Sequence, residues 1–309
     1  MQITGTCHHG HHHHSPTLKR LNLAAGLNEP QKDQLQDLFQ QAVDAREGAY
    51  APRSEFKVGA AILAEDGSVY TGSNKEFTIN ADHAEQRAVN QALLAGQKPL
   101  DLKAIAIFGA RGEVTAKNFE ERVAPCGNCR QALHELNPDM LAVGADGPGQ
   151  VQAYTLEQEL PDAYYREKKL PAPPVPIETG NPLINAALEA RSKSFVPRTR
   201  QPVGAAVETD KGVFLGTRAE VSSFTSQAAR MALGAALEAG ATHIHKLAII
   251  GGTESDKFER PSDLPFDTFE ALYKVAPEAE VVLPGANGEL RTHKAEEFPR
   301  FLLGDPAAA

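Results

Sequence analysis

The chain has 309 residues, of which 41% are hydrophobic and 23% are charged, and its formal net charge is −9 at pH 7. This composition is typical of a globular protein, so dominant disorder is excluded, and no apolar run approaches the ~18 residues of a membrane span. The acidic excess argues against binding to nucleic acid or to anionic membranes. At roughly 150 residues per domain, the length favours two domains or one large one.

Cysteine usage predicts a reducing, cytoplasmic environment, because three cysteines are too few for a disulfide framework. Cys126 and Cys129 lie close together and are available to bind a metal, whereas Cys7 lies near the N-terminus. The N-terminus lacks the apolar stretch of a secretory signal and carries six histidines within residues 8–14. We interpret residues 1–28 as a purification tag or flexible tail rather than a metal-holding tract.

An internal repeat divides the chain into two copies of one domain. At an offset of 145 residues, Arg46, Pro52, Arg53 and Val58–Ala61 recur as Arg191, Pro197, Arg198 and Val203–Ala206. Four consecutive identities within this wider match are hard to reach by chance. Between the copies, four prolines within residues 171–176 predict a stiff, extended linker. We therefore predict a tail at 1–28, a first domain at 29–160, a linker at 161–182 and a second domain at 183–309.

The first copy alternates between the periodicities of helices and strands. Apolar residues from Leu35 to Val43 fall near one helical face. The next expected elements are a hairpin (56–64 and 68–72), a helix (83–95, ended by Gly96), a strand (102–108), a helix from Pro125 and a strand (140–143). Strands followed by helices predict an α/β fold. We expect two tandem copies of a layered α-β-α domain, each with a mixed β-sheet flanked by helices.

His83 and the close cysteine pair form a candidate metal site. Cys126 and Cys129 share one face of a helix near its N-terminus, where the helix dipole favours thiolates. Two thiolates and one neutral imidazole neutralise a Zn²⁺ ion and leave a fourth position for water. Glu85, two residues after His83, then lies beside the metal and can pass a proton to a substrate nitrogen.

Two other interpretations of the cysteine pair are weaker. A structural zinc site usually needs a fourth Cys or His ligand, and no matching motif supplies one. A redox pair would not explain the nearby His83–Glu85 run. The sequence therefore predicts one catalytic zinc per chain. Arg130, next to Cys129, is either a surface charge or a donor to its thiolate.

H-x-E followed by P-C-x-x-C is the signature of zinc deaminases. The chain resembles the two-domain, homodimeric class of cytidine deaminases, which implies the fold of that family for both copies. Four stretches carry the resemblance: Ala49–Pro52 with Ser54, Phe56 and Val58–Ala60; Gly72–Phe77; His83–Gln86; and Pro125–Gln131. A weaker fifth, Leu160–Tyr164, is similar to the segment that closes over the site.

The resemblance implies zinc ligation by His83, Cys126 and Cys129, catalysis by Glu85, and substrate contacts by Phe56, Asn74, Glu76, Ala84, Ala124 and Tyr164. Asn74 and Glu76 would hold the sugar hydroxyls, and Phe56 would pack on the pyrimidine. The Ala84 N–H would meet the base carbonyl, and the Ala124 C=O would meet the exocyclic amine. Phe56 could instead be ordinary core, and Asn74 and Glu76 could be turn residues.

Three departures from the family pattern leave the substrate range open. Asp82 precedes His83, where the family usually places an apolar residue. The closing segment continues as Tyr164–Arg166 instead of Phe-Gly-Pro, and residues 109–123 form a longer, polar stretch.

The second copy has lost the metal site. Aligning Gly96 with Gly240 and Pro125 with Pro265 replaces His83 by Gln227, Glu85 by Ala229, Cys126 by Phe266, Cys129 by Phe269 and Asn74 by Arg218, while Glu76 matches Glu220. We expect this copy to fold without zinc, with the two phenylalanines filling the vacated space, and to serve assembly.

These observations predict zinc-dependent deamination of cytidine and deoxycytidine to uridine and deoxyuridine, in pyrimidine salvage. The alternatives are a deaminase of a modified cytosine nucleoside or nucleotide and a non-catalytic zinc-bound scaffold. The expected partners are a small nucleoside substrate and a second copy of the chain in a homodimer, without nucleic acid or membrane.

Overall fold

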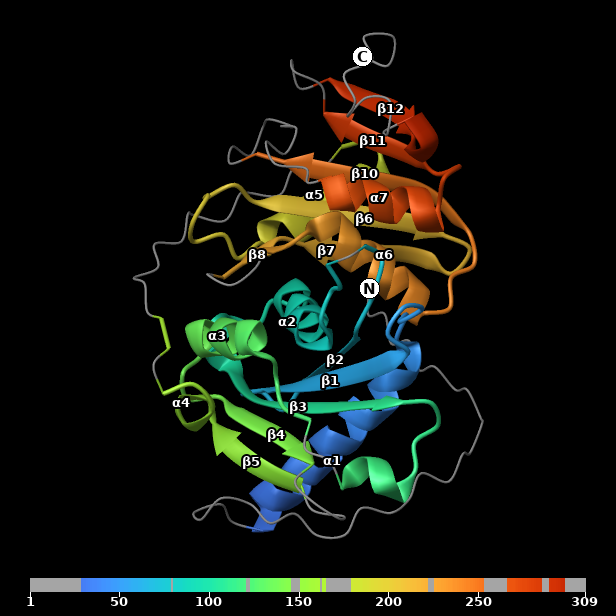
Figure 1. Ribbon diagram of the computed structural model, residues 1–309. Coiled ribbons are helices and arrows are strands. Elements are labelled where there is room, and N and C mark those ends of the chain that lie inside the picture. The colour runs from blue at the N-terminus through green and yellow to red at the C-terminus, as the bar shows by residue number, and fades with distance from the viewer. Residues whose placement is uncertain are drawn as a thin grey trace.

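The computed structural model describes residues 29–78, 80–120, 123–145, 151–161, 163–164, 179–221, 225–252, 266–284 and 289–297. These residues form two five-stranded sheets, each flanked by helices (Figure 1). The architecture confirms the predicted α/β class. The tail and most of the expected linker lie outside the described residues, so the domain boundaries stay a prediction. Among the helices that the structure describes, none combines the length and hydropathy of a membrane-spanning segment.

The first sheet has the strand order β2-β1-β3-β4-β5. Its half of the chain contains α1 (Glu29–Ala45), β1 (Phe56–Ala64), β2 (Val69–Ser73), α2 (Ala84–Leu94), β3 (Leu102–Arg111), α3 (Gly127–Leu136), β4 (Leu141–Ala145), β5 (Val151–Thr155) and α4 (Leu156–Glu159). Short 3-10 turns cover Arg46–Gly48, Pro99–Asp101 and Ala116–Phe119. Strands β3 and β4 are parallel, and the other neighbours are antiparallel.

Alternation along the strands separates two apolar layers in this half. Ala60 and Ile62 of β1 face α2 and α3, whereas Ala61 and Leu63 face α1. Successive strand side chains point to opposite faces, so one strand serves both layers. The sheet is therefore covered on both sides, as the apolar sequence of β1 and β3 requires.

The second half repeats this topology with the strand order β12-β11-β10-β6-β7. It contains α5 (Pro182–Ser192), β6 (Val203–Thr209), β7 (Gly212–Thr217), β8 (Ala219–Glu220), β9 (Thr225–Ser226), α6 (Ala228–Glu238), β10 (Ile244–Gly251), α7 (Phe266–Val275), β11 (Glu280–Pro284), β12 (Leu290–Lys294) and a 3-10 turn at Ala295–Glu297. Its one parallel pair, β10 with β11, matches β3 with β4. The repeated sequence thus corresponds to a repeated fold.

Most elements expected in the first half are confirmed. The helix expected from Pro125 begins at Gly127 with Cys126 as its N-cap, and the strand expected at 140–143 lies at Leu141–Ala145. Strand β5 and helix α4 were not predicted; the four residues of α4 are too few to show a helical period.

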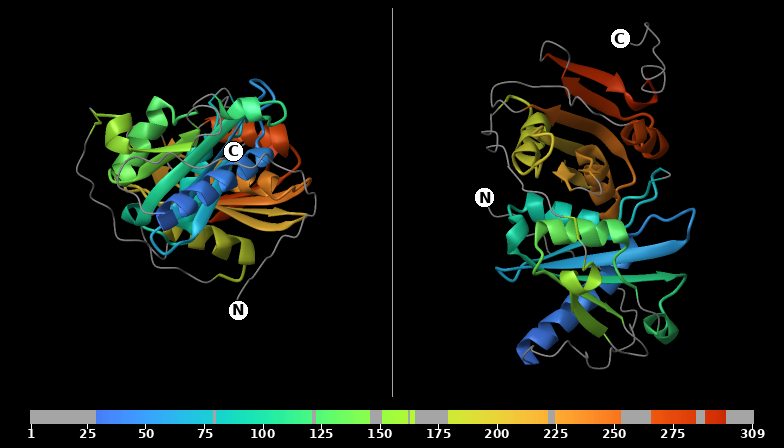
Figure 2. Two further views of the ribbon diagram at one scale, coloured as in Figure 1. Left: turned by 90° about the horizontal axis from the view of Figure 1, so that it is seen from below. Right: turned by 60° about the vertical axis from the view of Figure 1, so that its left-hand side comes forward.

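The two halves share their apolar cores. Phe77 of the first half packs in the core of the second, and Phe195 of the second half packs in the core of the first. Helices α2 and α6 lie between the two sheets (Figures 1 and 2). Arg87 of α2 is buried there and donates to the carbonyls of Arg230 and Met231 in α6. The halves therefore form one continuous packed structure.

The repeated glycine marks a close approach between a helix and a strand. A Cβ atom on Gly59 would lie 2.1 Å from the Ala42 carbonyl oxygen, and one on Gly204 would lie 2.0 Å from the Ala187 carbonyl oxygen. In each copy, the backbone of the first helix passes directly over the first strand. The repeated Val-Gly-Ala-Ala run is thus a packing requirement of the fold.

The repeated arginine caps the neighbouring strand. Arg46 is buried and donates from Nη2 to the Ala110 carbonyl oxygen at 3.0 Å. Arg191 is equally buried and donates from Nη1 to the Gly251 carbonyl oxygen at 3.1 Å. The same side chain thus binds a carbonyl near the C-terminal end of the equivalent strand in both copies.

We predict that Gly59→Ala lowers the free energy of unfolding by about 3 kcal/mol or more, because backbone atoms 2.1 Å away cannot move aside. Urea unfolding followed by circular dichroism measures the change. Gly180→Ala is the matched control, because a Cβ atom there meets nothing within 4 Å. Equal stability of the two variants would contradict the packing role.

Candidate metal centre

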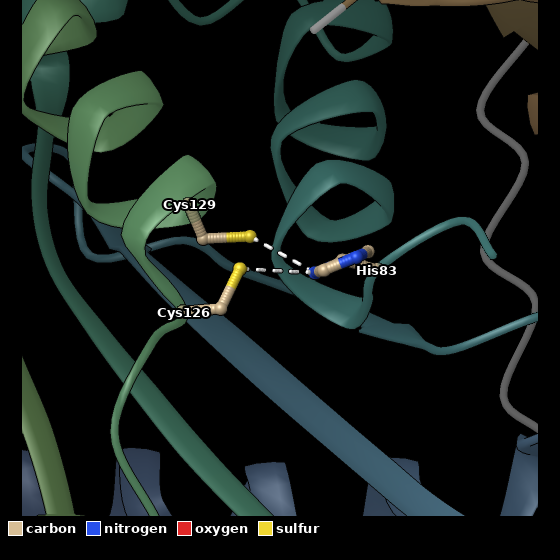
Figure 3. Close-up of side chains that lie close together, drawn as sticks. All are labelled: His83, Cys126 and Cys129. Atoms are coloured by element: carbon tan, nitrogen blue, oxygen red, sulfur yellow. Dashed lines mark hydrogen bonds between the residues drawn. The ribbon is translucent and has the colours of Figure 1, made fainter. Parts of the chain in front are cut away.

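His83, Cys126 and Cys129 come together where the N-termini of α2 and α3 approach each other (Figure 3). The His83 Nδ1 atom lies 3.5 Å from the Cys126 sulfur and 3.3 Å from the Cys129 sulfur. All three ligand atoms lie within 4.8 Å of one another, and no other such group occurs among the described residues. The structure therefore brings together the three residues that the sequence predicts as metal ligands.

Two helix N-termini present these side chains. His83 is the N-cap of α2, and Cys126 is the N-cap of α3, with Cys129 one turn further along. The Gln86 side chain accepts a hydrogen bond from the His83 backbone N–H at 2.9 Å, which fixes the start of α2. The positive ends of both helix dipoles point toward the cluster and stabilise thiolate charge.

Glu85 lies in the first turn of α2 and is 5% exposed. Burial raises the pKa of its carboxyl, and the nearby His83 and a hydrogen bond with Cys129 oppose that shift. The carboxyl is therefore adjacent to the cluster and shielded from solvent. A shielded carboxyl with a raised pKa can both accept and donate a proton.

Protons and a metal ion compete for the cluster. Hydrogen bonds from Cys129 and His83 lower the pKa of Cys126 to about 3. The same contact with Cys126, together with burial, raises the pKa of Cys129, and hydrogen bonding to Cys126 raises the pKa of His83. Metal ligation needs both sulfurs as thiolates and the imidazole as a neutral base, so binding releases protons and weakens as the pH falls.

The donor set fits zinc. Two thiolates and one imidazole are ligands that Zn²⁺ favours, and three protein ligands are typical of catalytic rather than structural sites. Cys129 is buried and Cys126 is exposed, so the cluster is accessible from one side.

Asn74 and Glu76 both bind backbone atoms near the start of β1. The Asn74 side chain accepts from the Val58 N–H at 2.8 Å and donates to the Phe56 carbonyl oxygen at 3.0 Å. The Glu76 carboxylate accepts from the N–H groups of Arg53 at 2.8 Å and Ser54 at 3.2 Å. Although burial opposes the shift, these hydrogen bonds lower the pKa of Glu76. Asn74 and Glu76 therefore bind the backbone of a turn, which is the alternative role that the sequence analysis gave for them.

The second copy keeps the glutamate contact but has an arginine in place of the asparagine. Glu220 accepts from the N–H groups of Arg198 at 3.1 Å and Thr199 at 3.0 Å, as Glu76 does at the equivalent turn. Arg218, in the position of Asn74, forms a buried ion pair with Glu220 at 2.9 Å. The turn contact of this glutamate is therefore present in both copies, including the copy without the metal residues.

The other four residues predicted to contact substrate differ in their exposure to solvent. Phe56 is half-buried, and its ring lies 2.8 Å from where a Cβ atom on Gly109 would be. Ala84 is buried at the start of α2, and Ala124 is half-buried before α3. Tyr164 is 58% exposed.

The side chain of Gln131 holds the segment that contains Tyr164. It donates to the Tyr164 carbonyl oxygen at 2.7 Å and accepts from the Tyr164 N–H at 2.9 Å. Asp162 and residues 165–178 lie outside the described part of the chain. Arg130 donates to the Pro125 carbonyl oxygen at 2.8 Å and pairs with Glu159 at 3.1 Å, so these groups, and not a thiolate, bind its guanidinium.

In the second copy, the equivalent positions are apolar or uncharged. Gln227 is the N-cap of α6, and Ala229 is buried. Phe269 is 2% exposed and packs in the second core, as expected from the sequence. The side chain of Phe266 lies outside the description.

The sequence did not predict that the second half contacts the strand leading to Asn74. Glu238 of α6 accepts hydrogen bonds from Ser73 and forms ion pairs with Lys75 and Arg87, both at 3.0 Å. Lys75 is fully buried between the two predicted sugar-binding residues. A fully buried lysine needs an anionic partner. The sequence does not show which part of the chain supplies that partner.

Comparison with known proteins identifies the family. Residues 32–145 match the model of the cytidine and deoxycytidylate deaminase zinc-binding region. A curated cytidine deaminase of Halalkalibacterium halodurans is 38% identical over 138 residues, which cover 43% of this chain and 95% of that protein. The chain belongs to the cytidine deaminase family. The matched zinc-binding region and the His/Cys/Cys donor set together identify Zn²⁺ as the cofactor.

Solved structures of cytidine deaminases are also similar to part of the chain. The enzyme of Burkholderia pseudomallei is 39% identical, with a TM-score of 0.36 over 42% of this chain and 98% of that one. The enzyme of Mycobacterium tuberculosis is 35% identical, with a TM-score of 0.33 over 43% of this chain and 98% of that one.

We predict that Glu238→Gln destabilises the protein in a pH-dependent way. Although burial opposes the shift, Arg87 and Lys75 lower the pKa of Glu238 from 4.5 to about 2. Burial also lowers the pKa of Lys75 to about 8. We therefore attribute the larger part of the lowering of the Glu238 pKa to Arg87. A depressed carboxyl pKa stabilises the folded state above pH 4.5, and this stabilisation disappears as the pH falls toward 2.

The expected difference is on the order of 3 kcal/mol at pH 6 and shrinks below pH 4.5. Urea unfolding between pH 6 and 3 measures it, in a Cys126→Ala background that removes zinc linkage. Glu280→Gln is the control, because its pair with Lys246 is exposed and contributes less than about 1 kcal/mol. A difference that does not change with pH would contradict this prediction.

Proposed function

We propose that the chain catalyses zinc-dependent hydrolytic deamination of cytidine and deoxycytidine. The observation that carries the proposal is the His83, Cys126 and Cys129 cluster with the buried Glu85 carboxyl beside it, in a member of the cytidine deaminase family. The carboxyl distinguishes this assignment from a structural zinc site, because metal retention alone does not require it.

His83, Cys126 and Cys129 would hold the ion. Zinc bound there supplies a Lewis acid that lowers the pKa of water and so provides a nucleophile near neutral pH. Glu85 takes the proton from the water that attacks C4 and transfers it to N3 of the cytosine ring. Glu85 then carries the second proton to the exocyclic amine, which leaves as ammonia. Water is consumed and the C4 carbonyl of uridine is formed.

The substrate-contacting residues belong to the same proposal. The Ala84 N–H and the Ala124 C=O would read the base, Phe56 would pack on it, and Tyr164 would lie in the segment that closes over it. Asn74 and Glu76 would bind the sugar hydroxyls. A carboxylate has about four acceptor positions, so Glu76 can hold the turn at Arg53 and still accept from a hydroxyl.

Glu85→Gln tests the chemical assignment. Glutamine has nearly the same shape and cannot shuttle protons, so we expect zinc content and folding to persist while kcat falls about 10²–10⁴-fold. Turnover is followed as the absorbance change from cytidine to uridine, with deoxycytidine, cytosine, cytidine monophosphate and a modified cytosine nucleoside measured in parallel. Preference for cytosine, cytidine monophosphate or the modified nucleoside over cytidine and deoxycytidine would contradict the proposal, as would unchanged turnover in the variant.

Cys126→Ala tests the ligand assignment. We expect one zinc per parent chain and loss of both zinc and activity in the variant, because two ligands retain zinc poorly. Metal analysis is performed on chains whose six tail histidines are replaced by serine. Cys7→Ala is the matched cysteine control and should keep both properties. Two zinc ions per parent chain would contradict the loss of the second site.

A homodimer, a cytoplasmic location and a role in pyrimidine salvage complete the proposal. The exposure of Cys126 and Tyr164 in the single chain supports a homodimer, because a second chain would then shield each site from water. Sedimentation equilibrium should give twice the chain mass. A monomer with full activity would contradict this part of the proposal.

A further inference from the structure

The segment from Ser73 to His83 contains both predicted sugar ligands and one predicted metal ligand, and the second half of the chain holds it. Glu238 binds Ser73 at its start, and the Lys274 ammonium donates to the Phe77 carbonyl oxygen at 3.1 Å. Arg230 of α6 binds the part of the segment immediately before His83.

Arg230 forms a two-point contact with Asp82. Its Nη2 atom lies 2.7 Å from Asp82 Oδ1, and its Nε atom donates to Asp82 Oδ2 at 3.2 Å. Its Nη2 atom also donates to the Asn80 carbonyl oxygen at 2.6 Å. On its own side, the guanidinium pairs with Asp267 at the start of α7. Arg230 and Asp82 are both at most 5% exposed.

This contact fixes the backbone next to the metal cluster. Asp82 also pairs with Lys75 through two backbone hydrogen bonds of 2.9 Å. With its carboxylate and its backbone both held, Asp82 has little freedom to rotate, and it is joined directly to His83. The backbone that leads into His83 is therefore held by a guanidinium from the other copy of the domain.

The contact exists in one direction only. In the alignment of the two copies, Ser226 occupies the place of Asp82, and Gln86 occupies the place of Arg230. Gln86 caps its own helix, whereas Arg230 reaches across to the first half. An interface that needed only packing would not need this pair, since two apolar residues stabilise a buried contact as well as an ion pair does.

We propose that Arg230 is a positioning residue for the metal centre and acts through Asp82 on His83. This inference rests on the proposed function only in taking His83 as a zinc ligand. Partners that hydrogen-bond a metal ligand change metal affinity or activity by about 10–100-fold when they are removed, and Arg230 would act one residue further from the metal. The copy without a zinc site would then contribute to the zinc site of the other copy.

The test compares Arg230→Met with Asn90→Ala. Asn90 is a buried interface residue whose amide bonds both backbone groups of Thr217, so its removal weakens the contact between the halves without touching residues 73–83. Cys7 and the tail histidines are replaced by serine in every chain. Zinc affinity is measured by competition with a chromophoric chelator, and Co²⁺-loaded protein is measured by visible absorption, which reports ligand geometry.

For Arg230→Met we expect zinc affinity to fall about tenfold or more, the Co²⁺ bands to shift, and kcat to fall while KM stays within about twofold. Asn90→Ala should lower the unfolding midpoint and leave zinc affinity and the Co²⁺ spectrum unchanged. Asp82→Val/Arg230→Met should recover folding stability but not zinc affinity. Parent-like zinc affinity in either Met variant would overturn the proposal.

If Arg230→Met fails to fold, the zinc affinity of Arg230→Lys tests the proposal instead. Lysine keeps the charge but cannot bind Asp82 at two points, so we expect zinc affinity about three- to tenfold below the parent, and the parental value would overturn the proposal. The metal measurements do not depend on substrate. Failure of the deaminase assignment would appear instead as zinc-loaded parent protein without turnover.

Discussion

The close packing of α2 on β2 determines where the metal centre forms. A Cβ atom on Gly72 would lie 2.5 Å from the Ala88 nitrogen and 2.6 Å from the Ala84 carbonyl oxygen, so the helix backbone rests directly on the strand. This contact places the N-terminus of α2, and with it His83, at a fixed distance from the sheet. The parallel strands β3 and β4 place α3 beside it, so that Cys126 and Cys129 approach His83. The cluster is a consequence of two helices whose N-termini meet over one sheet.

The second half has kept the fold and changed its chemistry. It has the equivalent strand order, the equivalent glycine contact and the equivalent buried arginine, yet Ala229 and Phe269 occupy positions that hold Glu85 and Cys129 in the first half. Such replacements are apolar and close-packed, which removes the need to bury an acid or a thiolate. Charged residues remain on α6 where that helix faces the first half, as Arg230 and Glu238 do.

The fold and the metal cluster were predictable from sequence because both depend on local patterns. The apolar period of β1, the stop at Gly96 and the spacing of His83, Cys126 and Cys129 all lie within single elements or short motifs. Contacts between the copies were not predictable in this way. Asp82 stands out in the sequence as an unexpected acid, but its partner is 148 residues away, and no periodicity encodes how two domains face each other.

The contact between Arg87 and Gly234 shows how the second copy accommodates a buried charge of the first. A Cβ atom on Gly234 would lie 2.0 Å from the Arg87 guanidinium, so Arg87 occupies the space that a larger residue at position 234 would need. In the first copy, the corresponding position is Asn90, and the counterpart of Glu238 is Leu94. Two first copies placed in this arrangement would bring each guanidinium against an amide and offer it no carboxylate. A pair made of one first and one second copy therefore gives Arg87 both space and a carboxylate partner, which two first copies in this arrangement would not give.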